Sequence, residues 1–223
     1  MKQGALFYPK EDKFGKKIPF DSLFIPYVYK EIYLEGVYTD VFNEQPKESM
    51  VILDVGANIG IVTQYMKKWA KKLYAIEPAS EHFAALKKNK EFNKWDNVEV
   101  FNIAIGAEDG EAELRLCEPN RTSHSIALAK TSNERGEKVK TQTFATFFKE
   151  NKIEKVDFCK FDVEGAEEQI LFSNGFVSVA DKIQAMEIEF HFKTFPRTVE
   201  HLLRLGFKSK RYSSSAVVIL FYR

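Results

Sequence analysis

The segment MVILDVGANIG, at residues 50–60, constrains the fold of this chain more than any other feature. Its first six residues form a short apolar run rich in β-branched side chains, which predicts a buried strand that breaks at Gly56. Residues 59–70 carry apolar side chains at helical spacing and predict a helix directly after the glycine turn. A buried strand that leads through a glycine turn into a helix is typical of a parallel α/β sheet.

The same alternation of strands and helices continues to the end of the chain. The next elements are predicted strands at 73–77 and 98–106, separated by a helix at 80–93 with Ser80 as its N-cap. The further predicted elements are strands at 111–118, 138–144, 156–163 and 182–191, a polar loop at 122–137, helices at 144–152, from about Ala166 and at 198–206, and an antiparallel hairpin at 207–223. Together they predict a mostly parallel sheet that closes with an antiparallel hairpin.

Residues 1–48 differ from the rest in composition, because aromatic side chains recur throughout them. We interpret this region as an N-terminal extension that packs on a core domain of residues 49–223, with part of 21–36 helical. A lid over a substrate is one hypothesis for the extension. Simple coverage of the core by its aromatic rings is the other.

The composition excludes several classes of protein. Lys and Arg total 33 against 32 for Asp and Glu, a net charge of +1, whereas a strongly basic nucleic-acid binder shows a larger excess. Two cysteines cannot form a disulfide scaffold. No apolar run approaches the roughly 18 residues of a membrane-spanning helix. The first residues lack the features of a signal peptide, so we expect a cytoplasmic protein.

Acidic and glycine residues at the ends of the first two strands predict a nucleotide-type site. Asp54 ends the first strand, Gly56 and Gly60 flank the turn, and Glu77 ends the second strand, where a carboxylate can accept hydrogen bonds from ribose hydroxyls. Asn58 stands where a dinucleotide site requires its second glycine. Since Asp54 would repel a pyrophosphate and attract an amino group, this pattern favours S-adenosylmethionine over a dinucleotide.

Further residues are expected to contact the same cofactor. Asn102 and Ala104 lie at the end of the third predicted strand, beneath the adenine, where Asn102 either pairs with the base edge or caps a turn. Tyr38 precedes the first core strand and is the residue of the extension best placed to reach the cofactor.

The segment KFDVEGAE, at residues 160–167, is the second informative stretch. Lys160, Asp162 and Glu164 alternate and are expected to share one face of a strand, which is costly in a buried strand unless the charges are paired or functional. In the structural interpretation, Asp162 ends the strand, Glu164 lies at a helix N-terminus, and Lys160 pairs with one of them. In the catalytic interpretation, Asp162 or Glu164 takes the proton of an incoming hydroxyl.

The next predicted strand adds a histidine to this region. Glu187, Glu189 and His191 are expected on one face of the strand at its carboxyl end, and His191 is a secondary candidate for the base. Acids at 162, 164 and 167 could bind magnesium, but Glu167 is expected inside the following helix, pointing elsewhere. We therefore assign no metal ligand.

The motifs DVGANIG (54–60), IEP (76–78), NIAIG (102–106), DFCKFDVEGAE (157–167) and MEIEFH (186–191) together resemble the FkbM family of S-adenosylmethionine-dependent methyltransferases. The resemblance implies the class I methyltransferase fold, a three-layer α/β/α arrangement around a seven-stranded sheet. It also implies O-methylation, with relatives that act on hydroxyls of sugars and polyketide macrocycles. It places Gly56, Asn58 and Glu77 on the cofactor, and the family's Lys-x-Asp-x-Glu-Gly run on 160–165, without showing which acid is the base. Pro78, next to Glu77, is a further candidate for cofactor binding.

The sequence is compatible with more than one function. The leading hypothesis is an O-methyltransferase for a small-molecule or glycan acceptor, with nucleic acid an unlikely partner and the oligomeric state open. The second is a methyltransferase that acts on RNA or protein, supported by lysines in the first two helical regions. The third is a non-catalytic binding module that retains the fold. A dehydrogenase is disfavoured by the missing middle glycine.

Overall fold

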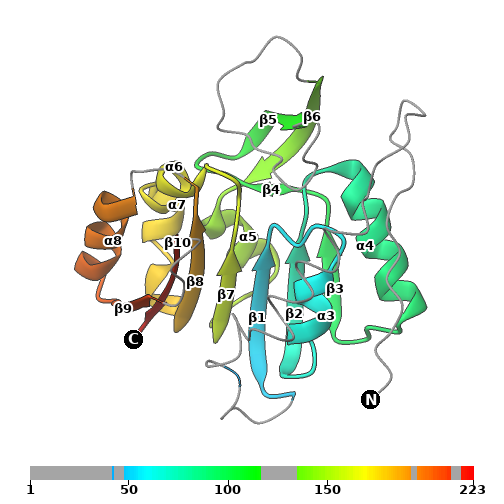
Figure 1. Cartoon of the computed structure of the whole chain (residues 1–223), viewed down its shortest axis with the longest axis horizontal. Helices are drawn as coiled ribbons and strands as arrows, with labels where there is room; N and C mark the ends of the chain where they lie inside the picture. The colour runs from blue at the N-terminus through cyan, green and yellow to red at the C-terminus, as the bar shows by residue number, and fades with distance from the viewer. Residues whose placement is uncertain (1–41, 43–47, 117–134, 192–194, 212–216) are drawn as a thin grey trace. The chain divides into compact units, whose positions relative to one another are not determined.

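A computed structural model of the chain describes residues 42, 48–116, 135–191, 195–211 and 217–223 (Figure 1). The chain folds into two compact units, Met1–Phe101 and Asn102–Arg223. Within the described residues, the main sheet contains seven strands in the order β3-β2-β1-β7-β8-β10-β9, and a second sheet contains three in the order β4-β6-β5.

The first unit is built on parallel strands with helical crossovers. Its described elements are the strands β1 (Met50–Val55), β2 (Ala70–Ile76) and β3 (Val98–Phe101) and the helices α3 (Ile61–Met66) and α4 (Ser80–Phe92). Strand β1 pairs in parallel with β2, and β2 with β3 (Figure 1). Ile52 and Leu53 are fully buried, as expected for a strand covered on both faces.

Three local predictions in this unit are wrong. Helix α3 ends at Met66 and β2 begins at Ala70, because a turn intervenes in which the Asn97 amide donates to the carbonyl oxygens of Lys67 and Ala70. The N-cap of α4 is Ala79, not Ser80. The predicted strand 98–106 is broken after Phe101, because β4 (Ala104–Ile105) pairs with β6 in the second sheet.

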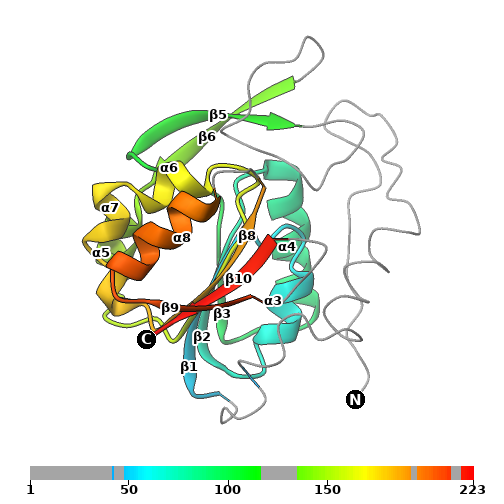
Figure 2. The ribbon, with the colours of Figure 1, turned by 60° about the vertical axis from the view of Figure 1, so that its left-hand side comes forward.

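The second unit combines the two sheets with short helices. Its described strands are β4, β5 (Gly110–Leu116), β6 (Arg135–Gln142), β7 (Phe158–Phe161), β8 (Ala185–Phe190), β9 (Lys208–Arg211) and β10 (Val217–Tyr222). Its helices are α5 (Phe144–Glu150), α6 (Glu167–Leu171), α7 (Asn174–Val177) and α8 (Phe195–Arg204), with a 3-10 turn at Ala180–Lys182. Figures 1 and 2 show α6, α7 and α8 gathered beside β8 and β10.

The pairing in this unit confirms the predicted hairpin. Strand β7 runs parallel to β8, whereas β10 is antiparallel to both β8 and β9. The predicted fold class, an α/β class I arrangement with a mostly parallel seven-stranded sheet and an antiparallel C-terminal hairpin, is therefore confirmed. In the described part of the chain, no helix is both long and apolar enough to cross a bilayer.

The core of the second unit is aromatic. Phe144, at the start of α5, lies 5.7 Å from the ring of Phe161 on β7 and 5.3 Å from that of Phe176 on α7. The Thr143 hydroxyl caps α5 by accepting from the Thr146 amide at 3.2 Å. The cap and the aromatic contacts together fix the end of this helix against β7.

Most of the N-terminal extension lies outside the described residues, including Tyr38 and the predicted helix within 21–36. Phe42 and Glu48 are the described residues of this region. Phe42 is fully buried in the first unit and stacks on Trp69 with ring centroids 4.8 Å apart. The boundary at residue 48 stays a prediction, as does the polar loop over 122–134, which lies outside the described residues. The predicted loop is wrong at residues 135–137, because they pair with β5 as the start of β6.

Candidate active site

The turn between β1 and α3 is built from residues in left-handed backbone conformations. Gly56, Asn58 and Gly60 have φ angles of 81°, 52° and 93°. Glycine adopts such angles without penalty, and asparagine tolerates them better than most residues. The Asn58 side-chain oxygen also accepts from the Ile59 amide at 2.7 Å. The asparagine at the middle position is therefore compatible with the turn.

Gly60 is also required by packing. A Cβ atom at this position would lie 2.7 Å from Leu86 Cδ1 and 3.0 Å from the Trp95 ring. Those distances are shorter than van der Waals contact, so a side chain here would displace α4 or Trp95. The role of Gly60 in this structure is to let these neighbours approach the turn.

Glu77 follows β2 and is bound to the turn through its carboxylate. Oε2 accepts from the Asn58 amide at 2.8 Å, and Oε1 accepts from the Ala79 amide at 2.9 Å. The imidazole of His82 lies 3.9 Å from Oε1. Since a carboxylate has about four acceptor positions, these two amides do not exclude ribose hydroxyls as further donors. A carboxylate in this position suits the ribose hydroxyls of an adenosine.

The other predicted cofactor residues differ in their exposure. Asp54 is fully buried, and its Oδ2 accepts from the Thr63 hydroxyl at 2.5 Å, which links β1 to α3. Pro78 is half-buried and Asn102 is exposed. Ala104 is buried in β4 opposite Thr141. Cofactor contacts by these four residues stay predictions.

A second group of ionisable side chains lies in the second unit, at the carboxyl ends of β7 and β8. We call it the acid–histidine cluster; its members are Lys160, Asp162, Glu164, Glu167, Glu187, Glu189 and His191. Lys160 stands opposite Glu187 in the parallel register of the two strands. The carboxyl ends of parallel strands are where open α/β sheets bind their ligands.

The turn that carries two of these acids differs from the prediction. Strand β7 ends at Phe161, so Asp162 and Glu164 lie beyond it rather than alternating within it. Glu164 has a φ of 54° and precedes Gly165 at 104°, and the N-cap of α6 is Ala166. Glu164 therefore belongs to a left-handed turn and not to the helix N-terminus. The turn nevertheless brings both acids to one histidine.

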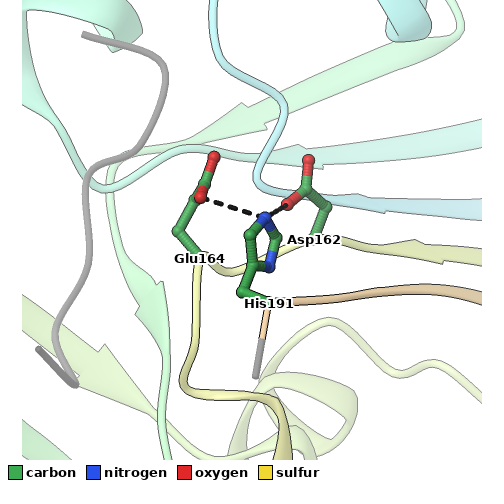
Figure 3. A group of neighbouring side chains, drawn as sticks. All are labelled: Asp162, Glu164 and His191. Atoms are coloured by element: carbon green, nitrogen blue, oxygen red, sulfur yellow. Dashed lines mark ion pairs between the residues drawn. The ribbon is translucent and has the colours of Figure 1, made fainter. Parts of the chain in front are cut away.

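His191 is the centre of the cluster. Its Nε2 lies 3.0 Å from Glu164 Oε2 and 3.8 Å from Asp162 Oδ1, and Figure 3 shows the ring between these two carboxylates. The same nitrogen is 3.8 Å from Glu189 Oε1. The sequence thus correctly placed His191 beside the acids of the 160–167 segment.

Glu167 points into the cluster, contrary to the prediction that it points elsewhere. Its Oε1 lies 2.9 Å from His191 Nδ1 and accepts from the Gly165 amide at 2.9 Å. One carboxylate oxygen therefore holds both the turn and the imidazole ring. The left-handed turn reverses the chain before α6, and strand alternation gave no indication of this reversal.

Lys160 and Glu187 are buried members of the cluster. Lys160 Nζ donates to Asp162 Oδ2 at 3.1 Å, which agrees with the predicted pairing of this lysine with one of the acids. Glu187 is 2% exposed, and neither of its carboxylate oxygens meets a hydrogen-bond donor in the described part of the chain. Burial raises the pKa of Glu187 well above its ordinary value, against the attraction of Lys160.

The cluster also changes the protonation of its more exposed members. Burial disfavours the charged form of His191, but hydrogen bonds to Glu164 and Glu167 outweigh it and raise the pKa of His191 to about 11. Burial and then the Asp162 carboxylate raise the pKa of Glu189 to about 7. The ring is therefore an imidazolium at neutral pH, and Glu189 changes its charge near neutrality.

Single ligand atoms of Asp162, Glu164 and His191 lie within 4.8 Å of one another, a spacing that raises the question of a metal. Both ring nitrogens of His191, however, face carboxylate oxygens at hydrogen-bond distance. This arrangement suits a protonated imidazole in an ion-pair cluster, and we assign no metal ligand here.

Comparison with known proteins assigns the chain to a fold class and to a protein family. Solved methyltransferase structures match most of the chain, which has the class I methyltransferase fold. The Methyltransferase FkbM domain matches residues 54–209, and the chain belongs to this family. The predicted family and its cofactor, S-adenosylmethionine, are thereby confirmed.

Curated relatives agree with this assignment. Methyltransferase 1 of Beauveria bassiana (strain ARSEF 2860) is 28% identical over 173 residues, which cover 69% of this chain and 68% of the relative. Methyltransferase sdnD of Sordaria araneosa is 26% identical over 177 residues, or 65% of this chain and 67% of the relative.

Two solved structures show the likeness of fold. Methyltransferase FkbM from Methylobacillus flagellatus KT matches with a TM-score of 0.55 and 15% identity, covering 87% of this chain and 48% of that one. An rRNA methylase from Streptococcus thermophilus matches with a TM-score of 0.52 and 11% identity, covering 82% of this chain and 90% of that one. At these identities, the likeness is one of fold alone.

Proposed function

We propose that the chain is an O-methyltransferase that moves a methyl group from S-adenosylmethionine to a hydroxyl of a sugar, a glycan or another small natural product. The observation that carries this proposal is the acid–histidine cluster at the carboxyl ends of β7 and β8. A hydroxyl is a weak nucleophile, and a positioned carboxylate that removes its proton accelerates such a reaction by about 10²–10⁴-fold.

The chemistry divides between the two sites. S-adenosylmethionine supplies the activated methyl group when bound. The turn at Gly56 and Asn58 and the Glu77 carboxylate would hold its adenosine, with Asp54, Gly60, Pro78, Asn102 and Ala104 as further candidates. The carboxylates of Asp162, Glu164 and Glu189 would orient the acceptor hydroxyl and take its proton, while Lys160 and His191 fix those carboxylates.

An RNA acceptor is the second candidate, because one matching fold is an rRNA methylase. The acid–histidine cluster argues against it, since its carboxylates outnumber its two cations, Lys160 and His191, and would repel a phosphate backbone. The lysines that supported this candidate are partly engaged: Lys68 lies over the Tyr65 and Trp69 rings, and Lys72 pairs with Glu99. A neutral or cationic small acceptor fits the charge better.

Calorimetric titration with S-adenosylhomocysteine tests the cofactor half of the proposal. We expect micromolar binding to the wild-type protein and at least ~100-fold weaker binding to Glu77→Ala. The variant loses the two hydrogen bonds that the ribose hydroxyls would donate to the carboxylate, each worth about 1.5–3 kcal/mol. Glu91→Ala, an exposed acid near the end of α4, is the matched control and is expected to bind like the wild type.

The alternatives predict other results. NAD, added in place of S-adenosylhomocysteine, is expected to give no heat of binding. If the folded wild-type protein bound neither compound, the chain would be a binding module that retains the fold. If Glu77→Ala bound as tightly as the wild type, the assignment of Glu77 would be wrong. Circular dichroism of each variant checks that its fold is intact.

A further inference from the structure

We propose that Glu189 is the general base of the reaction: its carboxylate takes the proton of the acceptor hydroxyl during methyl transfer. The inference rests on the proposed function as an O-methyltransferase. Asp162, Glu164 and His191 are the candidates that the sequence suggested for this role. Glu189 replaces them, although the sequence placed it only on the same strand face as His191 and did not mark it as the base.

The hydrogen bonds of the cluster distinguish Glu189 from the other acids. Asp162 Oδ2 accepts from Lys160, and Glu164 Oε2 and Glu167 Oε1 are both bound to the His191 ring. Glu189 has no hydrogen-bond donor among the residues that the structure describes, and its nearest cation is His191 Nε2 at 3.8 Å. Both Glu189 oxygens are therefore available to a hydroxyl, whereas Asp162, Glu164 and Glu167 each have one oxygen engaged.

The exposed fractions of the acidic side chains also favour Glu189. The side chain of Glu189 is 36% exposed, compared with 22% for Asp162, 18% for Glu164 and 4% for Glu167. The second oxygen of Asp162, Oδ1, has no donor but is buried. Glu187 is buried altogether. Among the described residues of the cluster, Glu189 is thus the acid most accessible to an incoming acceptor.

The surrounding charges adjust the basicity of Glu189. On β7 and its turn it faces Asp162, Glu164 and Lys160, on its own strand it has Glu187 and His191 as neighbours, and on β10 it stands opposite Val218. Burial and the nearby acids raise its pKa to about 7, against His191 and Lys160. A base whose pKa lies near the working pH combines a large ionised fraction with useful proton affinity.

The step balances without any other reactant. A lone pair of the acceptor oxygen forms the bond to the methyl carbon, and the carbon–sulfur bonding pair passes to sulfur, so that the sulfonium becomes the thioether of S-adenosylhomocysteine. The hydroxyl proton passes to the Glu189 carboxylate, which is thereby neutralised. Solvent later removes that proton from the partly exposed side chain. His191, held by Glu167 through Nδ1, stays an imidazolium throughout.

The first test measures Glu189 itself and needs no acceptor. Side-chain carboxyl resonances of protein labelled with ¹³C-glutamate are followed from about pH 3 to about pH 9, and the resonance absent from Glu189→Gln is assigned to Glu189. We expect its midpoint near neutrality. A midpoint near the ordinary glutamate value of about 4.3 would overturn the proposal.

The second test measures the reaction with a panel of sugars and hydroxylated natural products. With an acceptor that the wild type methylates, Glu189→Gln is expected to lower kcat at least ~100-fold and to lose the rise in rate through about pH 7, with S-adenosylhomocysteine affinity changed less than about twofold. The control Glu168→Gln, whose ion pair is with Arg197 on α8, is expected to keep the wild-type rate.

The outcomes separate this inference from the proposed function. If Glu189→Gln turned over at nearly the wild-type rate, Glu189 would not be the base, although the enzyme would still be an O-methyltransferase. If the wild type methylated no hydroxyl of the panel, the proposed acceptor class would fail. The carboxyl titration would then decide by itself whether Glu189 is a proton acceptor near neutral pH.

Discussion

At the scale of single residues, the sequence predicts positions whose requirement is local. The turn between β1 and α3 needs left-handed backbone angles, and the glycines and asparagine that adopt them can be recognised in the sequence. Glu77 could be predicted as well, because strand ends are set by local hydrophobic runs. Glu167 could not, since its direction depends on a turn whose geometry involves the His191 ring from another strand.

Gly60 provides a prediction at this scale. Gly60→Ala is expected to lower the free energy of unfolding by about 1–3 kcal/mol more than Gly206→Ala does, as measured by urea denaturation. Both glycines have nearly the same φ, 93° and 91°, so the backbone penalty is shared. The new methyl group at position 60 meets Leu86 and Trp95, whereas the one at position 206 meets only the Arg223 guanidinium.

Comparison with Gly206→Ala separates the backbone cost of Gly60→Ala from its packing cost. If both variants lost the same stability, the cost would come from the backbone angle alone and the packing role of Gly60 would be wrong. A larger loss for Gly60→Ala would attribute the difference to close packing around the turn.

At the scale of elements, strands were easier to predict than the segments between them. The hydrophobic runs located β1, β7 and β8 to within a few residues, because burial on both faces leaves a continuous apolar pattern. The break between β3 and β4 was missed, since β4 pairs with β6, a partner distant in the sequence. Asp162 and Glu164 lie close together, as predicted. The prediction relied on alternation within a strand, whereas the structure brings them together in the turn after β7.

The ion pairs of His191 predict how stability depends on pH. The folded-state pKa of His191 is about 11, while an unfolded histidine has a pKa of about 6.5. Between these values the folded protein keeps a proton that the unfolded chain has lost. The contribution of His191 to the free energy of unfolding is therefore complete below about pH 6.5 and decreases as pH rises toward 11.

Denaturation of wild type and His191→Gln at about pH 6 and about pH 9 measures this effect. The stability advantage of the wild type is expected to shrink from the lower to the higher pH. Because His191 lowers the pKa of Glu189, which titrates in the same range, both proteins carry Glu189→Gln in this comparison. An advantage that stayed constant between the two conditions would contradict the imidazolium assignment.

At the scale of the whole molecule, the order of elements was the strongest indication in the sequence. Strand and helix alternate from residue 50 onward and end in the hairpin of β9 and β10, a combination that few folds share. The identity of the acceptor has no comparable pattern, because it depends on side chains that several elements contribute. The family assignment therefore specifies a methyl group as the transferred group, and experiments must identify the acceptor.

Methyl transfer to a hydroxyl is measured most directly by supplying the protein and the acceptor panel with S-adenosylmethionine labelled with ¹³C in its methyl group. The chemical shift of the transferred carbon identifies the atom to which it is bound. We predict a methyl group on oxygen with the wild type, with none above background for Glu77→Ala at low cofactor concentration. A methyl group found on nitrogen, on RNA or on protein would contradict the account.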